Sequence, residues 1–205
     1  TEQLTRDLQD AIMAVRAQPM RAVFQRMQRV VREAANLAGK KVHLEMEGED
    51  TEVDRTLIEK LTDPLTHMLR NAVDHGVEKE QIRLDSGKSN IGTIKLSAAH
   101  KSGRVVITLS DDGAGINRNR VRDIAVDRGI ISQDAQLTNS EIDNLIFAPG
   151  FSTATTVTDL SGRGVGMDVV KQAIQDLGGR ISIASEAGKG SSFSLSLQLT
   201  LAVMD

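Results

Sequence analysis

The sequence alternates between two hydrophobic periods, and this alternation restricts the possible folds more than any other feature. Residues 91–112 and 180–200 each contain two stretches in which apolar and polar residues alternate around a short turn, which predicts two β-hairpins. Residues 41–47 have the same period and predict a further strand. Apolar residues at every third or fourth position predict helices over residues 20–37 and 50–75. Together these patterns predict an α+β fold, a two-layer sandwich in which a mixed, mostly antiparallel sheet is covered on one face by helices.

The first residues form a separate part of this pattern. Residues 1–17 carry a helical apolar stripe with no partner nearby in the sequence, so we expect an N-terminal helix that packs on another part of a longer protein. The start at Thr1 rather than Met agrees with that expectation. Pro19 disfavours helix at the residue before it, which predicts a hinge at residues 17–20. The helix over residues 50–75 should be bent or restarted at Asp63–Pro64.

Composition argues against several classes of protein. The 205 residues are 40% hydrophobic, which is enough for a sizeable core. A net charge of -3, with no Trp, no Tyr and four Phe, argues against nucleic acid as a partner. The absence of Cys rules out disulfides and thiolate metal sites and is typical of a reducing cytoplasm. No apolar stretch is long enough to span a membrane.

The predicted helix over residues 50–75 has an unusual polar face. At 100° per residue its apolar residues fall on one side, and the other side carries the following residues: His67, Arg70, Asn71, Asp74 and His75. Such a face is most often only solvated, but Asn and His are poorer helix formers than Lys and Glu. An Asn amide oxygen and a carboxylate suit Mg²⁺, while His and Arg can bind phosphate oxygens. Both interpretations remain open from the helix alone.

Two glycine-rich segments are equally ambiguous when taken singly. In "DDGAGI", Asp111 ends a predicted strand and is either a turn residue or an acceptor for an exocyclic amine such as that of adenine. Without Trp or Tyr, a bound base would lie against aliphatic side chains, for which Ile116 and Met167 are candidates. Three alternate glycines at residues 162–166 precede a predicted helix. They indicate either a loop with positive φ angles or an anion site at the helix N-terminus.

Together and in order, five motifs resemble a known family. "HMLRNAVDHG", "DDGAGI", "FAPGFST", "GRGVGMDVV" and "GKGSSFSL" are similar to the N, G1, F, G2 and G3 boxes of the ATPase superfamily of gyrase, heat-shock chaperone, MutL and histidine kinases. The residues of these motifs most resemble those of the CheA-type chemotaxis histidine kinases. The resemblance implies a Bergerat-type ATP-binding fold, with residues 20–205 as the catalytic domain and residues 1–19 as the end of a dimerisation helix and its hinge.

The resemblance also implies roles for individual residues. Catalysis is expected from His67, Arg70 and Asn71, with Asn71 holding the Mg²⁺ that bridges the ATP phosphates and Asp111 accepting from the adenine amino group. The residues expected to bind the nucleotide are Asn71, Asp74, His75, Asp111, Gly113, Gly115, Ile116, Ser152, Gly162, Arg163, Gly164, Val165, Gly166, Met167 and Ser191. Gly188 and Gly190 would help Ser191 to close the base pocket, although many relatives have Thr where this chain has Ser191. Ala154 stands where close relatives are expected to have a lysine, so a cation near the phosphates is missing.

The function implied is transfer of the γ-phosphoryl group of Mg-ATP to a histidine on a separate phosphoacceptor domain. His43 and His100 lie in predicted strands and His67 and His75 in the nucleotide site, so none of the four histidines is expected to be the acceptor. The implied partners are the phosphoacceptor domain and, through the parent kinase, a coupling protein and a chemoreceptor. The resemblance further implies a cytoplasmic, homodimeric parent and leaves a monomeric fragment open. A conformational ATPase and a non-catalytic ATP-binding scaffold remain as alternatives.

The last expectation concerns a polar stretch of the sequence. Residues 152–164 have little apolar area with which to offset the backbone entropy of an ordered loop. We therefore expect residues 131–166 to act as an ATP lid that is mobile until nucleotide binds.

Overall fold

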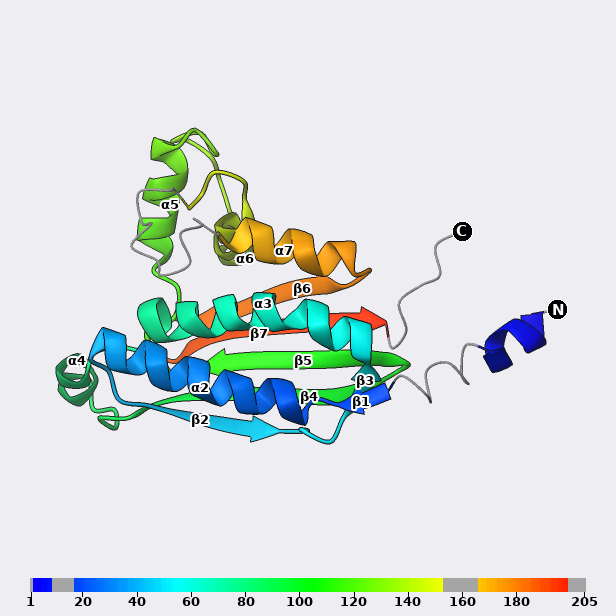
Figure 1. Ribbon diagram of the computed structural model, residues 1–205. Helices are drawn as coiled ribbons and strands as arrows, with labels where there is room; N and C mark the ends of the chain where they lie inside the picture. The colour runs from blue at the N-terminus through cyan, green and yellow to red at the C-terminus, as the bar shows by residue number, and fades with distance from the viewer. Residues whose placement is uncertain (1, 9–16, 153–165, 199–205) are drawn as a thin grey trace.

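The computed structural model describes residues 2–8, 17–152 and 166–198. Its elements are β1 (Ala17–Pro19), α2 (Arg21–Ala38), β2 (Val42–Glu47), β3 (Glu52–Asp54), α3 (Arg55–Asn71), η1 (Ala72–Gly76), α4 (Glu80–Asp85), β4 (Gly92–Lys101), β5 (Arg104–Asp111), α5 (Arg118–Asp127), α6 (Asn139–Asn144), η2 (Leu145–Phe147), α7 (Met167–Asp176), β6 (Arg180–Glu186) and β7 (Gly190–Gln198). Residues 2–8 also form a helix. Figure 1 shows two layers, a sheet and the helices α2, α3 and α7 on one of its faces. The predicted α+β sandwich is confirmed.

The main sheet contains both predicted hairpins. Its strand order is β2-β4-β5-β7-β6, with β2 parallel to β4 and the other neighbours antiparallel. The turn between β4 and β5 has positive φ at Ser102 (53°) and Gly103 (76°), the geometry that suits the twist of a two-residue hairpin loop. Strand β5 lies in the middle of the sheet; its last residue, Asp111, pairs with Ile94 of β4, and the residue before it, Ser110, pairs with Ser192 of β7.

The core lies between the sheet and the helices. All the apolar positions predicted for the long helix are buried: Ile58, Leu61, Leu65, Met68, Leu69, Ala72 and Val73. Ile94 and Leu96 of β4 and Ile107 of β5 meet them from the sheet side of the same cluster. Burial of this stripe fixes the rotation of α3 and leaves its polar face outside the core.

The segment predicted as one helix over residues 50–75 differs from that prediction in two ways. Residues 52–54 form strand β3, and α3 begins only after Asp54, whose carboxylate accepts from the Thr56 N–H (2.8 Å). The helix then continues through Pro64 without a restart. Proline inside a helix costs about 3 kcal/mol, but Pro64 is buried, and its contacts with the core offset part of that cost.

The predicted hinge at residues 17–20 coincides with a paired strand and a buried residue. Residues 17–19 form β1, which pairs antiparallel with β3, and Met20 is fully buried with its N–H bonded to the Thr51 carbonyl (3.0 Å). Pro19 was the only local signal in the sequence, and three-residue strands have no detectable period. In the helix of residues 2–8, Leu4 and Leu8 are 69% and 62% exposed. That another part of a longer protein covers Leu4 and Leu8 stays a prediction.

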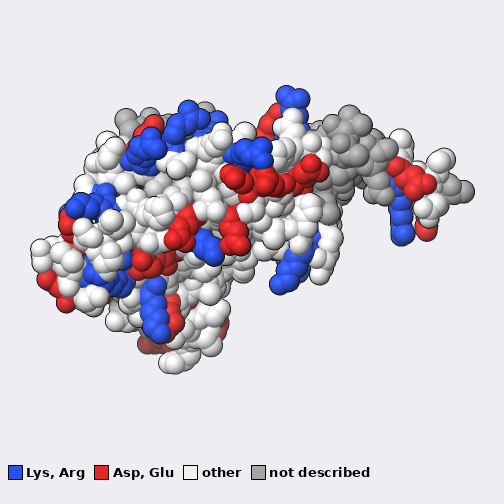
Figure 2. Space-filling model, turned by 90° about the horizontal axis from the view of Figure 1, so that it is seen from below, with Lys and Arg blue, Asp and Glu red and all other residues white. Residues whose placement is uncertain are grey.

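The surface shows no strong separation of charge on the side that Figure 2 presents, where Lys and Arg are interspersed with Asp and Glu. Within the parts of the chain that the structure describes, no helix has the length and apolar character needed to cross a bilayer.

Candidate functional site

The polar face of α3 ends in a widened turn. Val77 N–H donates to the Ala72 carbonyl (2.8 Å), five residues back, so that residues 72–76 form a π-helical turn. This turn follows Asn71 and carries Asp74 and His75, both of which are exposed. Such turns redirect the chain at the end of a helix and often occur at functional sites.

Lys40 supports this turn from the end of α2. Its Nζ donates to the carbonyls of Val73 (2.8 Å) and Asp74 (2.9 Å), where a cation is favourable because the helix dipole is negative. Burial lowers the pKa of Lys40, and the charge of Asp74 partly opposes that shift. No sequence pattern indicated this role, because the partners of Lys40 are backbone groups more than thirty residues away.

Asn71 connects the two helices that carry the predicted phosphate-binding motifs. Its Nδ2 lies 3.2 Å from the Sδ of Met167, the first residue of α7. His67 and Arg70 are half-buried on α3, and His67 lies one helical turn before Asn71. The structure thus places Met167 against Asn71, with His67 and Arg70 on the same helix as Asn71.

Asn71 has the chemistry needed to hold Mg²⁺. With its Nδ2 directed at the Met167 sulfur, the amide oxygen is the atom that can meet a cation. No group of three or more His, Cys, Asp or Glu residues suited to a metal occurs in the described part of the chain. Mg²⁺ is commonly held by one or two protein oxygens together with nucleotide phosphates and water, and Asn71 fits that manner of binding.

Asp111 lies at the other end of the site, as the last residue of β5. Its Oδ1 accepts from the Gly113 N–H (2.9 Å), and the Ser191 N–H also donates to the carboxylate. Burial raises the pKa of Asp111, those two hydrogen bonds oppose the shift, and the charges of Asp112 and Glu78 add to it. Asp111 is half-buried, so its carboxylate is partly withdrawn from water, where a bond from a ligand amine is stronger than in bulk solvent.

The glycines of the G1 motif are required by close backbone contacts. A Cβ on Gly113 would lie 1.9 Å from the Gly76 carbonyl oxygen, and one on Gly115, whose φ is +78°, would lie 2.5 Å from the Glu186 carbonyl oxygen. Ala114 N–H donates to the Gly76 carbonyl (3.0 Å). This turn is consequently fixed between η1 and the end of β6.

Ser191 and Ile116 are connected through Ser185, a residue that was not among the predicted site residues. Ser185 Oγ accepts from the Ile116 N–H (2.8 Å) and lies 3.1 Å from Ser191 Oγ. The hydroxyl of Ser191 is thereby joined to the G1 turn. The sequence contained no signal for Ser185, since serine recurs throughout these two strands.

The remaining predicted residues divide into two groups. Ser152 and Gly166 are neighbours, because a Cβ on Gly166 would lie 2.9 Å from the Ser152 Cβ. Gly162, Arg163, Gly164 and Val165 lie outside the described residues, as does Ala154.

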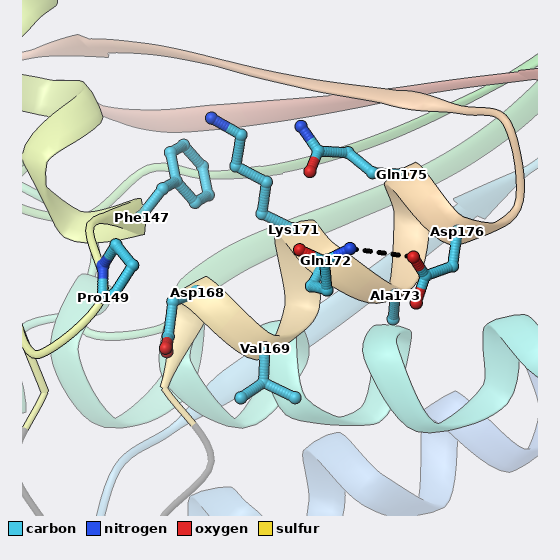
Figure 3. Close-up of a pocket in the computed structure, with 9 residues that line it drawn as sticks. All are labelled: Phe147, Pro149, Asp168, Val169, Lys171, Gln172, Ala173, Gln175 and Asp176. Carbon is cyan, nitrogen blue, oxygen red and sulfur yellow. Dashed lines mark hydrogen bonds between the residues drawn. The ribbon is translucent and has the colours of Figure 1, made fainter.

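A surface hollow beside α7 does not coincide with this site. Figure 3 shows Phe147 and Pro149 on one side and residues of α7, including Lys171 and Gln175, on the other. Lys171 Nζ lies 5.6 Å from the centroid of the Phe147 ring, which also contacts Phe193 edge-on at 6.2 Å. The F motif therefore uses Phe147 to attach residues 145–147 to α7 and the sheet.

Comparison with known proteins agrees with this geometry. Residues 60–201 match the family described as histidine kinase-, DNA gyrase B-, and HSP90-like ATPase. The chain is 61% identical to a chemotaxis protein CheA of Rhizobium meliloti over 204 residues, which are 100% of this chain and 27% of that protein. It is also 61% identical to a CheA of Cereibacter sphaeroides, over 98% of this chain and 29% of that protein. The chain thus spans between a quarter and a third of these relatives.

Solved structures agree on the fold. The nucleotide-free catalytic domain of the histidine kinase ThkA has a TM-score of 0.54 at 18% identity, covering 90% of this chain and 95% of that one. The histidine kinase domain of the Erythrobacter litoralis EL346 blue-light activated kinase has a TM-score of 0.50 at 16% identity, covering 88% and 65%. The chain therefore belongs to the histidine kinase-, DNA gyrase B- and HSP90-like ATPase family, as an ATP-binding catalytic domain of the CheA type.

Proposed function

We propose that this domain binds Mg-ATP and transfers its γ-phosphoryl group to a histidine on a separate phosphoacceptor domain of a chemotaxis kinase. The observation that carries the proposal is the half-buried Asp111 carboxylate at the end of β5, held by the Gly113 and Ser191 N–H groups. A carboxylate in that environment suits the amino group of adenine. The similarity to CheA proteins supports the kinase reaction.

The base end of the site would recognise the nucleotide. Asp111 would accept from the adenine amino group, while Ile116 and Met167 would offer apolar surface to the ring. Gly113 and Gly115 keep side chains away from the turn next to Asp111. This recognition needs an acceptor that is held in place, and the hydrogen bond from the Gly113 N–H to Asp111 supports that requirement.

The phosphate end would position the reacting group. Asn71 would hold Mg²⁺, which neutralises phosphate charge when it is bound with ATP. Arg70, Asp74 and His75 would line this end, and His67 would assist the transfer of the phosphoryl group. Phosphoryl transfer requires positioning and charge neutralisation more than covalent chemistry from the protein.

The phosphate end would be closed by the segment that begins at Ser152. We propose that residues 162–167 complete the lid and contact the phosphates, with Ala154 leaving one cation fewer than in close relatives. Gly166 precedes Met167 at the start of α7, where backbone N–H groups are available to an anion.

The acceptor and the other partners would come from the parent protein. We infer that residues 1–19 contain the end of a dimerisation helix and its connection to the domain, with β1 as the last part of that connection. We also infer that the phosphoacceptor, coupling protein and chemoreceptor act through the remainder of a cytoplasmic, homodimeric kinase. His43 and His100 lie on strands β2 and β4, and His100 Nε2 lies 2.7 Å from the Glu52 carbonyl oxygen, so that ring has a structural contact.

The test is transfer from ATP labelled at the γ-phosphate to an isolated histidine phosphoacceptor domain. The wild-type domain should label that partner on histidine, Asn71→Ala should not, and Asn36→Ala, on the exposed side of α2, should match the wild type. Hydrolysis of ATP without labelled partner would identify a conformational ATPase. Nucleotide binding with neither reaction would identify a scaffold, and either result would reject the kinase proposal.

A further inference from the structure

Arg83 of α4 is a large buried group that the proposed chemistry does not use. Its residue exposure is 1%, and its guanidinium binds acceptors on several sides. It donates to the carbonyls of Ser89 (2.7 Å) and Ile91 (3.4 Å), to Glu78 Oε1 (3.0 Å) and to both carboxylate oxygens of Asp112 (3.2 and 3.1 Å). A buried guanidinium is tolerated only when it is paired in this way.

Lys88 binds the same turn from a second direction. Its Nζ donates to Glu78 Oε2 (2.7 Å) and to the carbonyls of Asp112 (2.9 Å) and Gly113 (2.8 Å). Glu78, whose side chain is 10% exposed, bridges the two cations. The residues between η1 and β4 therefore form one charged unit, the α4 clamp, consisting of Glu78, Arg83 and Lys88.

The α4 clamp acts on the backbone that aims Asp111. The carbonyls of Asp112 and Gly113 are held by Lys88, and the N–H of Gly113 is the donor to Asp111 Oδ1. Asp112 is fixed further by the Thr93 N–H, which donates to its Oδ1 (2.9 Å). The backbone that follows the adenine acceptor is thus held by bonds to the clamp and to β4.

The charges of the clamp also matter to Asp111. Glu78 and Asp112 are nearby carboxylates whose charges oppose ionisation of Asp111, and Arg83 and Lys88 pair with both of them or with their backbone. Burial raises the pKa of Glu78, but the Lys88 hydrogen bond, a bond from its own backbone and the charges of Lys88 and Arg83 outweigh burial, so that this pKa is lowered. Without Lys88, the negative charge beside Asp111 would be less compensated.

We infer that the α4 clamp is a positioning device that sets the purine specificity of the site, by holding Asp111 where it accepts from the amino group of adenine. This inference rests on the proposed ATP-binding function. Adenine presents an amino donor where guanine presents a carbonyl oxygen. A fixed carboxylate favours the first and repels the second, whereas a loosely held one discriminates less.

The test compares two lysines that each pair with a glutamate. Lys88→Met removes the clamp cation, and Lys95→Met removes a lysine of β4 that pairs with Glu47 (3.2 Å) but is 50% exposed. Affinities for ATP and GTP are measured by competition against a fluorescent ADP analogue, together with the melting temperature. In Lys88→Met the ATP affinity should fall about tenfold, as expected for loss of charge-assisted bonds, with the GTP affinity nearly unchanged. Lys95→Met should keep the wild-type ratio.

Two further variants guard against a merely structural effect. Glu78→Gln keeps the shape and removes the bridging charge, and it should lower the ATP preference even if Lys88→Met does not fold. Lys88→Arg keeps a cation and should restore part of the preference. A lower melting temperature with the wild-type ATP-to-GTP ratio in both Lys88→Met and Glu78→Gln would overturn the inference. Wild-type protein that does not bind ATP would instead overturn the proposed function.

Discussion

The base end and the phosphate end of the site are constructed differently. At the base end, Asp111 is held in a turn with backbone contacts to η1, β6 and the α4 clamp. At the phosphate end, Asp74 and His75 are exposed, and Arg70 is half-buried. A desolvated acceptor must be positioned before the ligand arrives, because an unmade bond there is costly. Polar groups that meet phosphate and Mg²⁺ can stay hydrated until the nucleotide binds. The comparison predicts that affinity and specificity depend on the first region and transfer on the second.

The largest effect should follow from Asn71→Ala, which removes the proposed Mg²⁺ ligand. Phosphoryl transfer should fall by about 10²–10³-fold, the effect of losing one electrostatic stabiliser, and nucleotide binding should lose its dependence on Mg²⁺. His67→Gln should slow transfer by about 10²-fold with ATP affinity unchanged. The rates are measured with labelled ATP and the affinities by calorimetry. Transfer by His67→Gln at the wild-type rate would remove His67 from the chemistry.

The next effect should follow from Asp111→Asn at the base end. Loss of a charge-assisted bond of about 2–3 kcal/mol should weaken ATP binding roughly thirty- to a hundredfold. Because burial raises the pKa of Asp111, the ionised carboxylate costs folding free energy at neutral pH, and the variant should melt at the same or a higher temperature. Asp123→Asn, at an exposed position of α5 outside the proposed lid, is the control for calorimetry and melting. Wild-type affinity in folded Asp111→Asn would place adenine recognition elsewhere.

A smaller effect concerns the proposed lid and the phosphates. Cleavage by trypsin after Arg163 should be fastest without nucleotide, slower with ADP, and slowest, by severalfold, with a non-hydrolysable ATP analogue. The γ-phosphate is expected to supply the anion for the glycine-rich segment. Cleavage at Arg128, which lies outside the proposed phosphate site, gives the internal reference. The same protection in all three states would contradict the lid assignment.

The smallest effect should be the loss of ATP affinity at low pH, the acid limb of the binding curve. Adenine needs the ionised Asp111, whose pKa lies above that of an ordinary carboxyl because of burial. ATP affinity should therefore fall about twofold where the pH equals that raised pKa, and it should decline further as the pH falls. The protonated carboxyl favours the folded state, so this group's contribution to folding stability is present below its unfolded pKa and is lost as the pH rises through the folded pKa. Calorimetry across pH checks the binding, and an acid limb identical to that of an exposed aspartate would contradict the assignment.

Local periodicity in the sequence predicted much of the fold. The apolar stripe from Ile58 to Val73 correctly indicated which side of α3 faces the core, and the turn at residues 101–103 correctly joined β4 to β5. Strand β1 was missed because three residues give no period and its partner lies more than thirty residues away. Continuation of α3 through Pro64 was missed because core contacts there override local propensity.

The site residues could be predicted only from the family motifs, and contacts made by residues between the motifs were missed. Asp111 and Asn71 occupy the expected ends of β5 and α3, while their ligands remain predictions. Arg83 lies in a short, charged helix and would be assigned to the surface from sequence alone, yet it is buried. Its main partner, Asp112, is 29 residues further on. Contacts of that separation depend on the assembled sheet, and no local pattern in a single sequence encodes them.

The pairing of β1 with β3 connects the chain that enters the domain to the start of α3. Strand β3 ends at Asp54, which caps α3, and β1 is joined to β3 residue by residue, with Ala17 opposite Asp54. A pull or twist on the chain ahead of Ala17 would therefore reach the cap of α3 through the pairing of β1 with β3, whose Val53 belongs to the hydrophobic core. Helix α3 contains 17 residues, a rod of about 26 Å, and Asn71 is at its far end. Because burial fixes the rotation of α3, a shift at its cap would be carried along the whole helix toward Asn71 and the proposed phosphate end.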